Sequence, residues 1–126
     1  MPLVHHELCF GCGRVNLFGL LAELDRSGPG AVTGRCFLKQ DHTGPDRGAA
    51  HPGILAAALT EAMALACGPD ARPTAVEIHF EGDAPIGGFV ELEARVERRD
   101  GPTLHAVATA TADQRMVARG RGSFRS

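Results

Sequence analysis

A change of sequence period near residue 70 constrains the fold of this chain more than any other feature. Residues 52–67, PGILAAALTEAMALAC, are rich in alanine and leucine, and Gly68-Pro69 follows them. Proline is favoured in the first turn of a helix and Gly-Pro ends one, so the segment predicts a helix from Pro52 to about Cys67. From residue 74 onward apolar residues recur at every second position, which predicts strands.

The predicted helix is apolar on more than one side. At 100° per residue, one face carries the larger apolar residues and the opposite face carries further alanines. The first face holds Leu55, Leu59, Ala62 and Ala66, and the opposite one holds Ala56, Ala57 and Ala64. We therefore expect the helix to be buried on several sides.

Six strands are predicted around this helix. Two of them, 18–25 and 31–39, form a hairpin through the turn cluster RSGPG, and the loop DHTGPDRGAAHPG leads into the helix. Four more follow at 74–81, 90–97, 104–110 and 116–124, the last two joined by the turn TADQR. The predicted fold class is α+β, with a long central helix wrapped by a curved antiparallel sheet of about six strands. Such a sheet leaves edge strands, which a dimer can pair.

Length and composition limit the class of function. At 126 residues the chain fits one domain, 1–126, and its net charge of -2 gives no reason to expect nucleic acid or an anionic membrane as partner. No apolar run has the length of a membrane span, and the first residues lack the order of a signal peptide. We expect a cytoplasmic protein that acts on a small molecule, without a cofactor.

The first 17 residues form a Cys/Gly-rich arm that raises the question of a metal. His5, His6, Cys9 and Cys12 place four possible zinc ligands within eight residues. A closed zinc site usually draws on two separated pairs of ligands, and only one cysteine pair is present here. We therefore predict a packed arm without a metal, with metal binding by these residues as the alternative.

Two stretches carry a resemblance to a known family. CFGCGRVNLFGL is similar to the Cys-rich opening, and HPGILAAALTEAMA to the HGG signature, of PaaI-like acyl-CoA thioesterases in the hotdog superfamily. The resemblance implies a homodimer with a continuous sheet, often paired into a tetramer, with active sites at the subunit interface. It also implies that the helix N-terminus faces the thioester carbonyl of an acyl-CoA.

The chain departs from the family at the oxyanion donor. The first family glycine, whose N–H stabilises the oxyanion, falls on Pro52, which has no N–H. Gly53 is the candidate to replace it, and Ile54 is the next amide along. His51 matches the family histidine, which orients the preceding loop, so we expect it to cap the helix or anchor the loop.

The family's catalytic aspartate falls on Thr60. A neutral hydroxyl cannot act as a general base, although it can hold a water molecule. Glu61 and Asp46 are the candidate replacement carboxylates, but Glu61 is expected to face a different side of the helix. Thr74 is the candidate for the Ser or Thr that the family contributes from the opposite subunit.

These residues leave two main hypotheses of different classes. The first is a thioesterase that hydrolyses an acyl-CoA or acyl-carrier-protein thioester with a non-standard site. The second is a non-catalytic acyl-thioester-binding protein that keeps the substrate tunnel but not the chemistry. Dehydration of a hydroxyacyl thioester is a weaker third reading, since only His51 is well placed for it.

Overall fold

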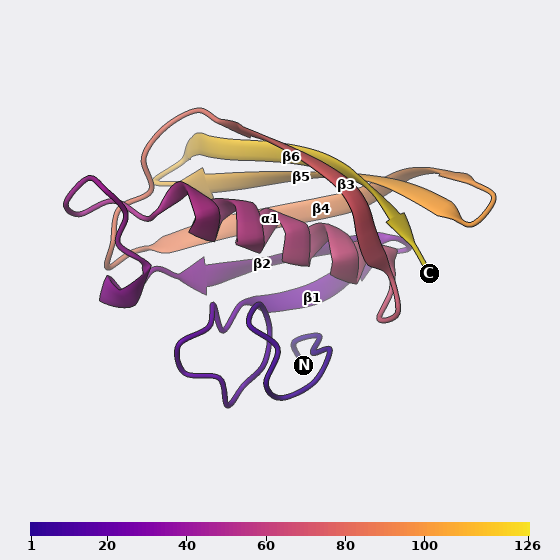
Figure 1. Ribbon diagram of the computed structural model, residues 1–126, viewed down its shortest axis with the longest axis horizontal. Coiled ribbons are helices and arrows are strands. Elements are labelled where there is room, and N and C mark those ends of the chain that lie inside the picture. Colours follow the sequence, from indigo (N-terminus) through magenta and orange to yellow (C-terminus); the bar gives the residue numbers. More distant parts are fainter.

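The computed structural model describes all residues 1–126, as one long helix packed against one six-stranded antiparallel sheet (Figure 1). The helix α1 is Pro52–Cys67, and a short 3-10 turn, η1, is Gln40–His42. The strands are β1 Glu23–Gly28, β2 Ala31–Phe37, β3 Arg72–Phe80, β4 Phe89–Asp100, β5 Thr103–Ala112 and β6 Arg115–Arg125. The sheet order is β1-β2-β4-β5-β6-β3, which confirms the expected α+β fold and its order of elements.

The helix begins and ends where the sequence predicts. It starts at Pro52, and Gly68 ends it with a positive φ and an N–H that donates to the carbonyl of Ala64. It packs mainly against β4, β5 and β6, and Figure 1 shows it lying along one face of the sheet. Half of its residues are buried, including Ala64 on the second apolar face, whereas Ala56 and Ala57 are only half-buried.

The first strand differs from the prediction. It starts at Glu23 rather than Phe18, because Leu21 has a positive φ that interrupts the extended run. The N–H groups of Leu20 and Ala22 donate to arm carbonyls at Phe10 and Gly11 instead of to a strand. Residues 18–22 therefore belong to the N-terminal arm. Strand β1 continues past Asp25 through Ser27, so the turn before β2 is shorter than the predicted RSGPG.

The edge strand β3 is more exposed than its alternating pattern predicts. Val76 is 37% exposed and Phe80 is 51% exposed, while Ile78 between them is half-buried. Strand β3 pairs only with β6, so its other edge has no partner within the chain. The helix covers the middle of the sheet and leaves the apolar residues of this edge strand uncovered.

The last hairpin confirms the turn TADQR. Asp113 and Gln114 form a two-residue connection with positive φ values of 51° and 65°, as a tight hairpin turn requires. A register shift between Ala110 and Thr111 then displaces the pattern on β6. Met116 is consequently 44% exposed, and the adjacent Val117 is buried.

Hydrogen bonds hold the arm, residues 1–22, against β1 and also fold it upon itself. The N–H of Leu3 donates to Leu24, and the Arg14 side chain donates to the carbonyls of Cys12 and Ala22. Cys12 is fully buried and joins the main hydrophobic core. No helix of the structure has the length and hydropathy of a membrane span.

Candidate active site

The N-terminus of α1 has no free amide in its first turn. Pro52 has no N–H, the N–H of Gly53 donates to Nδ1 of His51 at 2.8 Å, and that of Ile54 donates to the carbonyl of His51 at 2.9 Å. His51 is therefore the N-cap residue, and its side chain is exposed. The Gly53 amide becomes available to a ligand only if the His51 ring turns away, which its exposure permits.

Thr60 lies two turns further along α1, half-buried. Its hydroxyl donates to the carbonyl of Ala56 at 2.8 Å, a common contact of threonine within a helix. Because the proton is used in this bond, the remaining lone pairs of Oγ1 are acceptors. The side chain can thus accept a hydrogen bond from water, but it has no basic group to remove a proton.

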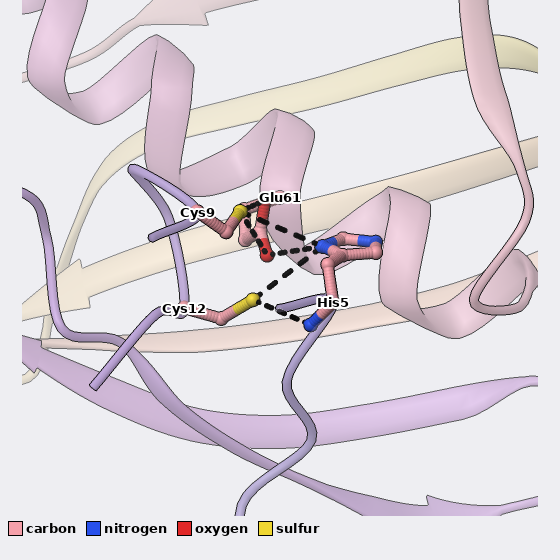
Figure 2. A group of neighbouring side chains, drawn as sticks. All are labelled: His5, Cys9, Cys12 and Glu61. Atoms are coloured by element: carbon pink, nitrogen blue, oxygen red, sulfur yellow. Dashed lines mark hydrogen bonds and ion pairs between the residues drawn. The ribbon is translucent and has the colours of Figure 1, made fainter. Parts of the chain in front are cut away.

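Glu61 points into a cluster with the arm rather than standing alone at a surface. Its carboxylate lies 3.0 Å from Nδ1 of His5 and 3.8 Å from Sγ of Cys9, and its side chain is 11% exposed (Figure 2). Cys12 completes this group. Burial raises the pKa of the Cys12 thiol far above its ordinary value, and the neighbouring Glu61 raises it further.

Thr60 and Glu61 nonetheless line the same cavity, although the helix separates them by 100°. The cavity measures about 250 Å³ and lies between the arm, the middle of α1 and the start of β3. Its walls are His5, His6, Cys9, Thr60, Glu61, Ala64, Ala71, Arg72 and Pro73. The sequence predicted that the two side chains would face different surfaces, whereas in the structure both line this one cavity.

Asp46 and Thr74, the other candidate side chains, do not line this cavity. Asp46 is exposed at the tip of the loop before α1, and its carboxylate makes no hydrogen bond or ion pair within the chain. Thr74 is exposed at the start of β3, where a register shift leaves it opposite no residue of β6. Its hydroxyl donates to the carbonyl of Ser123 at 3.1 Å. Bulges of this kind are frequent next to active sites.

The structure adds one residue that the sequence analysis did not single out. His42 is only 1% exposed, and its carbonyl accepts the N–H of His51 at 2.7 Å. Nδ1 of His42 accepts the N–H of Lys39 at 3.0 Å. Burial lowers the pKa of His42, and the positive charge of Lys39 lowers it further. The sequence did not predict that His42 is buried, because its burial depends on how the polar loop around it folds back.

Solved structures with the same fold include a thioesterase superfamily member and two proteins named for phenylacetic acid degradation. A phenylacetic acid degradation-related protein from Ralstonia eutropha JMP134 is 19% identical, with a TM-score of 0.77 over 85% of this chain and 86% of its own. The PaaI protein of Escherichia coli is 20% identical, with a TM-score of 0.77 over 84% of this chain and 79% of its own. Zebra fish thioesterase superfamily member 2 is 21% identical, with a TM-score of 0.73 over 82% and 80%.

These likenesses define the fold. The chain shares the fold of these proteins, which is the hotdog fold that the two motif stretches led us to expect. No protein-family model matches the sequence, and no curated protein resembles it in sequence. At such identities the shared fold does not transfer a catalytic residue.

Proposed function

We propose that the protein hydrolyses an acyl-CoA, or an acyl-carrier-protein thioester, to the free acid and thiol. The observation that carries this proposal is Thr60, which lines a cavity along α1 of a fold shared with a named thioesterase superfamily member. The motif resemblance implies that the family's catalytic aspartate stands at this position. The active unit in this proposal is a homodimer, since β3 presents an unpaired edge and uncovered apolar residues. A partner subunit on that edge would close the cavity beside the start of β3 and bring its own Thr74 near the site.

The proposed reaction is direct attack by a bound water. Thr60 Oγ1 accepts a hydrogen bond from the water and orients its oxygen toward the carbonyl carbon. The carbon–oxygen bond forms, the carbon–sulfur bond breaks, and the proton lost by the water ends on the leaving thiolate. The N–H of Gly53, released by His51, stabilises the oxyanion together with the helix dipole.

The candidate carboxylates, Glu61 and Asp46, do not act as the general base in this scheme. Glu61 is engaged by His5 at 3.0 Å, and Asp46 lies on an exposed loop. A base of this kind typically contributes about 10²–10⁴-fold to a rate, so its absence predicts a slow enzyme or one with a narrow substrate range.

A second function is favoured by a specific observation. The first turn of α1 has no unoccupied amide, and position 60 has no carboxylate, so the site lacks both standard parts of the hydrolytic machinery. A protein that binds acyl thioesters without cleaving them fits the same geometry.

One pair of measurements separates the two functions. Calorimetric binding of a non-hydrolysable thioether analogue of an acyl-CoA is expected for both, whereas release of free thiol from the matching thioester is expected for the hydrolase alone. The panel should include aryl, short-chain, medium-chain and polycyclic acyl groups. Analogue binding without any thiol release across the panel would favour the binding protein, and neither binding nor release would contradict both functions.

A further inference from the structure

Four side chains of metal-binding type converge between the arm and α1, outside the chemistry proposed above. His5, Cys9 and Cys12 come from the arm and Glu61 from the helix, and Figure 2 shows them pointing toward one another. One donor atom from each lies within 4.8 Å of all the others. The arm itself offers one cysteine pair with His5 and His6 beside it. The fold supplies a separate ligand from the helix, 49 residues after Cys12.

A single hydrogen bond does not account for the position of the His5 ring in this cluster. Nδ1 of His5 lies 3.0 Å from Glu61 Oε2, 3.4 Å from Cys12 Sγ and 3.7 Å from Cys9 Sγ. A ring nitrogen has either one hydrogen or one lone pair, so it can serve one of these three groups. The other ring nitrogen, Nε2, is buried without a hydrogen-bond partner. The ring is therefore turned so that Nδ1 faces all three neighbours at once, which one hydrogen bond does not explain.

The spacings match a tetrahedral ion. Bonds of about 2.3 Å to sulfur and about 2.0–2.1 Å to nitrogen or oxygen separate tetrahedral ligand atoms by about 3.4–3.8 Å. The two sulfur–nitrogen distances in the cluster are 3.4 and 3.7 Å, and the sulfur–oxygen distances from Cys9 are 3.8 Å. The 3.0 Å separation of His5 and Glu61 is shorter, and coordination to a shared ion would lengthen it slightly.

The arm is shaped for close approach to Glu61. A Cβ on Gly11 would lie 2.4 Å from Cδ of Glu61, and a Cβ on Gly13 would lie 2.3 Å from the carbonyl oxygen of Glu7. The N–H of Gly13 donates to the carbonyl of Cys9 at 2.8 Å, which closes the turn between the cysteines. The N–H of His5 donates to Sγ of Cys12 at 3.1 Å, a contact that favours the thiolate. Gly13 thus permits a tight turn in which a Cβ would meet backbone atoms, and Gly11 leaves room for the end of the Glu61 side chain.

We propose that His5 Nδ1, Cys9 Sγ, Cys12 Sγ and the Glu61 carboxylate bind one zinc-class divalent cation in a closed, four-coordinate site. Two thiolates with an imidazole and a carboxylate suit zinc, and four protein ligands make the site structural rather than catalytic. Binding releases the two thiol protons to solvent and leaves the His5 proton on Nε2. The 250 Å³ cavity, lined by His5, Cys9 and Glu61, gives the ion a route to the site.

The ion would fasten the arm to the middle of α1. Glu61 is adjacent to Thr60, so the site would also fix the helix surface beside the proposed reaction centre. This inference concerns metal binding and stability, and it does not depend on thioester hydrolysis. Its outcome can therefore be read separately from that of the proposed function.

The test is metal binding by the full-length protein. We expect chelator-treated protein to take up one equivalent of zinc per chain, measured by competition with a chromophoric chelator, and to melt at a higher temperature when zinc is present. Cobalt in its place should give the near-ultraviolet sulfur-to-cobalt charge-transfer band of a thiolate site and the visible spectrum of tetrahedral coordination.

Variants assign the ligands. Cys9→Ser and Glu61→Gln should each weaken zinc binding at least about tenfold and abolish the thermal shift. The matched controls are Cys67→Ser and His6→Ala, because Cys67 lies at the far end of α1 and His6 is the exposed neighbour of His5. Circular dichroism of the chelated proteins checks that all variants fold. The proposal is overturned if the parent binds neither metal, if bound cobalt shows no thiolate band, or if the controls lose as much affinity as the ligand variants.

Discussion

His51 Nδ1 accepts the N–H of Gly53 at 2.8 Å, so the amide proposed to stabilise the oxyanion is occupied in the free protein. The fold thereby places a competitor for the substrate carbonyl on the residue that caps the helix. Removing that competitor separates the capping role of His51 from the catalytic role of Gly53.

His51→Ala is expected to lower stability and raise the hydrolysis rate. Loss of an N-cap costs about 1 kcal/mol, because the Gly53 N–H loses its partner, but the same N–H is then free for the oxyanion. Chemical denaturation and thiol release measure the two effects. Gly53→Pro, which loses the same cap and also the N–H, is the matched comparison and should lower the rate. Equal rates in the two variants would remove Gly53 from the mechanism.

Thr60 should respond in opposite directions to two substitutions. Thr60→Val keeps the shape but removes the acceptor for water, and we expect kcat to fall by about tenfold or more. Thr60→Asp supplies the missing base, and a gain of about 10²-fold is expected. Steady-state kinetics with the best substrate of the panel measures both. A valine variant as fast as the parent would contradict a role for the hydroxyl.

Strand β3 should control assembly. Phe80 is 51% exposed beside an unpaired strand edge, so Phe80→Lys is expected to convert the dimer to monomer and to abolish hydrolysis. Light scattering coupled to size exclusion measures the mass. Thr33→Lys, an exposed position on β2, is the control and should remain dimeric. Retention of the dimer by the Phe80 variant would place the interface elsewhere.

His42 should make the protein sensitive to acid. Because burial lowers the pKa of His42, the unfolded chain takes up its proton first as the pH falls. The stabilisation from the neutral ring is present above its unfolded pKa of about 6.5 and is lost below it, with a slope of at most about 1.4 kcal/mol per pH unit.

His42→Asn tests this dependence, since the amide can still accept the Lys39 N–H. The variant is expected to be less stable at pH 7 but to lose less stability between pH 7 and pH 5. Urea denaturation across that range, with a chelator present in every sample, gives the comparison. Identical slopes in parent and variant would assign the acid sensitivity to other groups.

The sequence predicted the fold well because its main signals are local. The helix bounds follow from Pro52 and Gly68, and the tight turn at Asp113-Gln114 follows from the polar residues between two alternating runs. The first strand was misplaced because Leu21 adopts a positive φ, which an apolar run does not reveal. The exposure of β3 depends on its place at the sheet edge, which the pattern along one strand does not encode.

The site was less predictable than the fold. Position 60 and the first turn follow from the motif, but the hydrogen bond from Gly53 to His51 depends on a side-chain rotamer. Glu61 was a candidate base because it is next to Thr60 in the sequence. Its contact with His5 joins residues 56 positions apart, which the sequence does not reveal. Only the folded arm brings Glu61 to the histidine and cysteines of the arm, so the sequence showed the arm ligands but not the ligand from the helix.

Thiol release from the acyl-CoA panel tests the central claim most directly, with parent and Thr60→Val protein compared at several enzyme concentrations. The account predicts release that is first order in parent enzyme for at least one acyl group, and slower release with the valine variant. Release no faster than the uncatalysed background at every enzyme concentration, from protein that binds the thioether analogue, would contradict hydrolysis and leave acyl-thioester binding as the function.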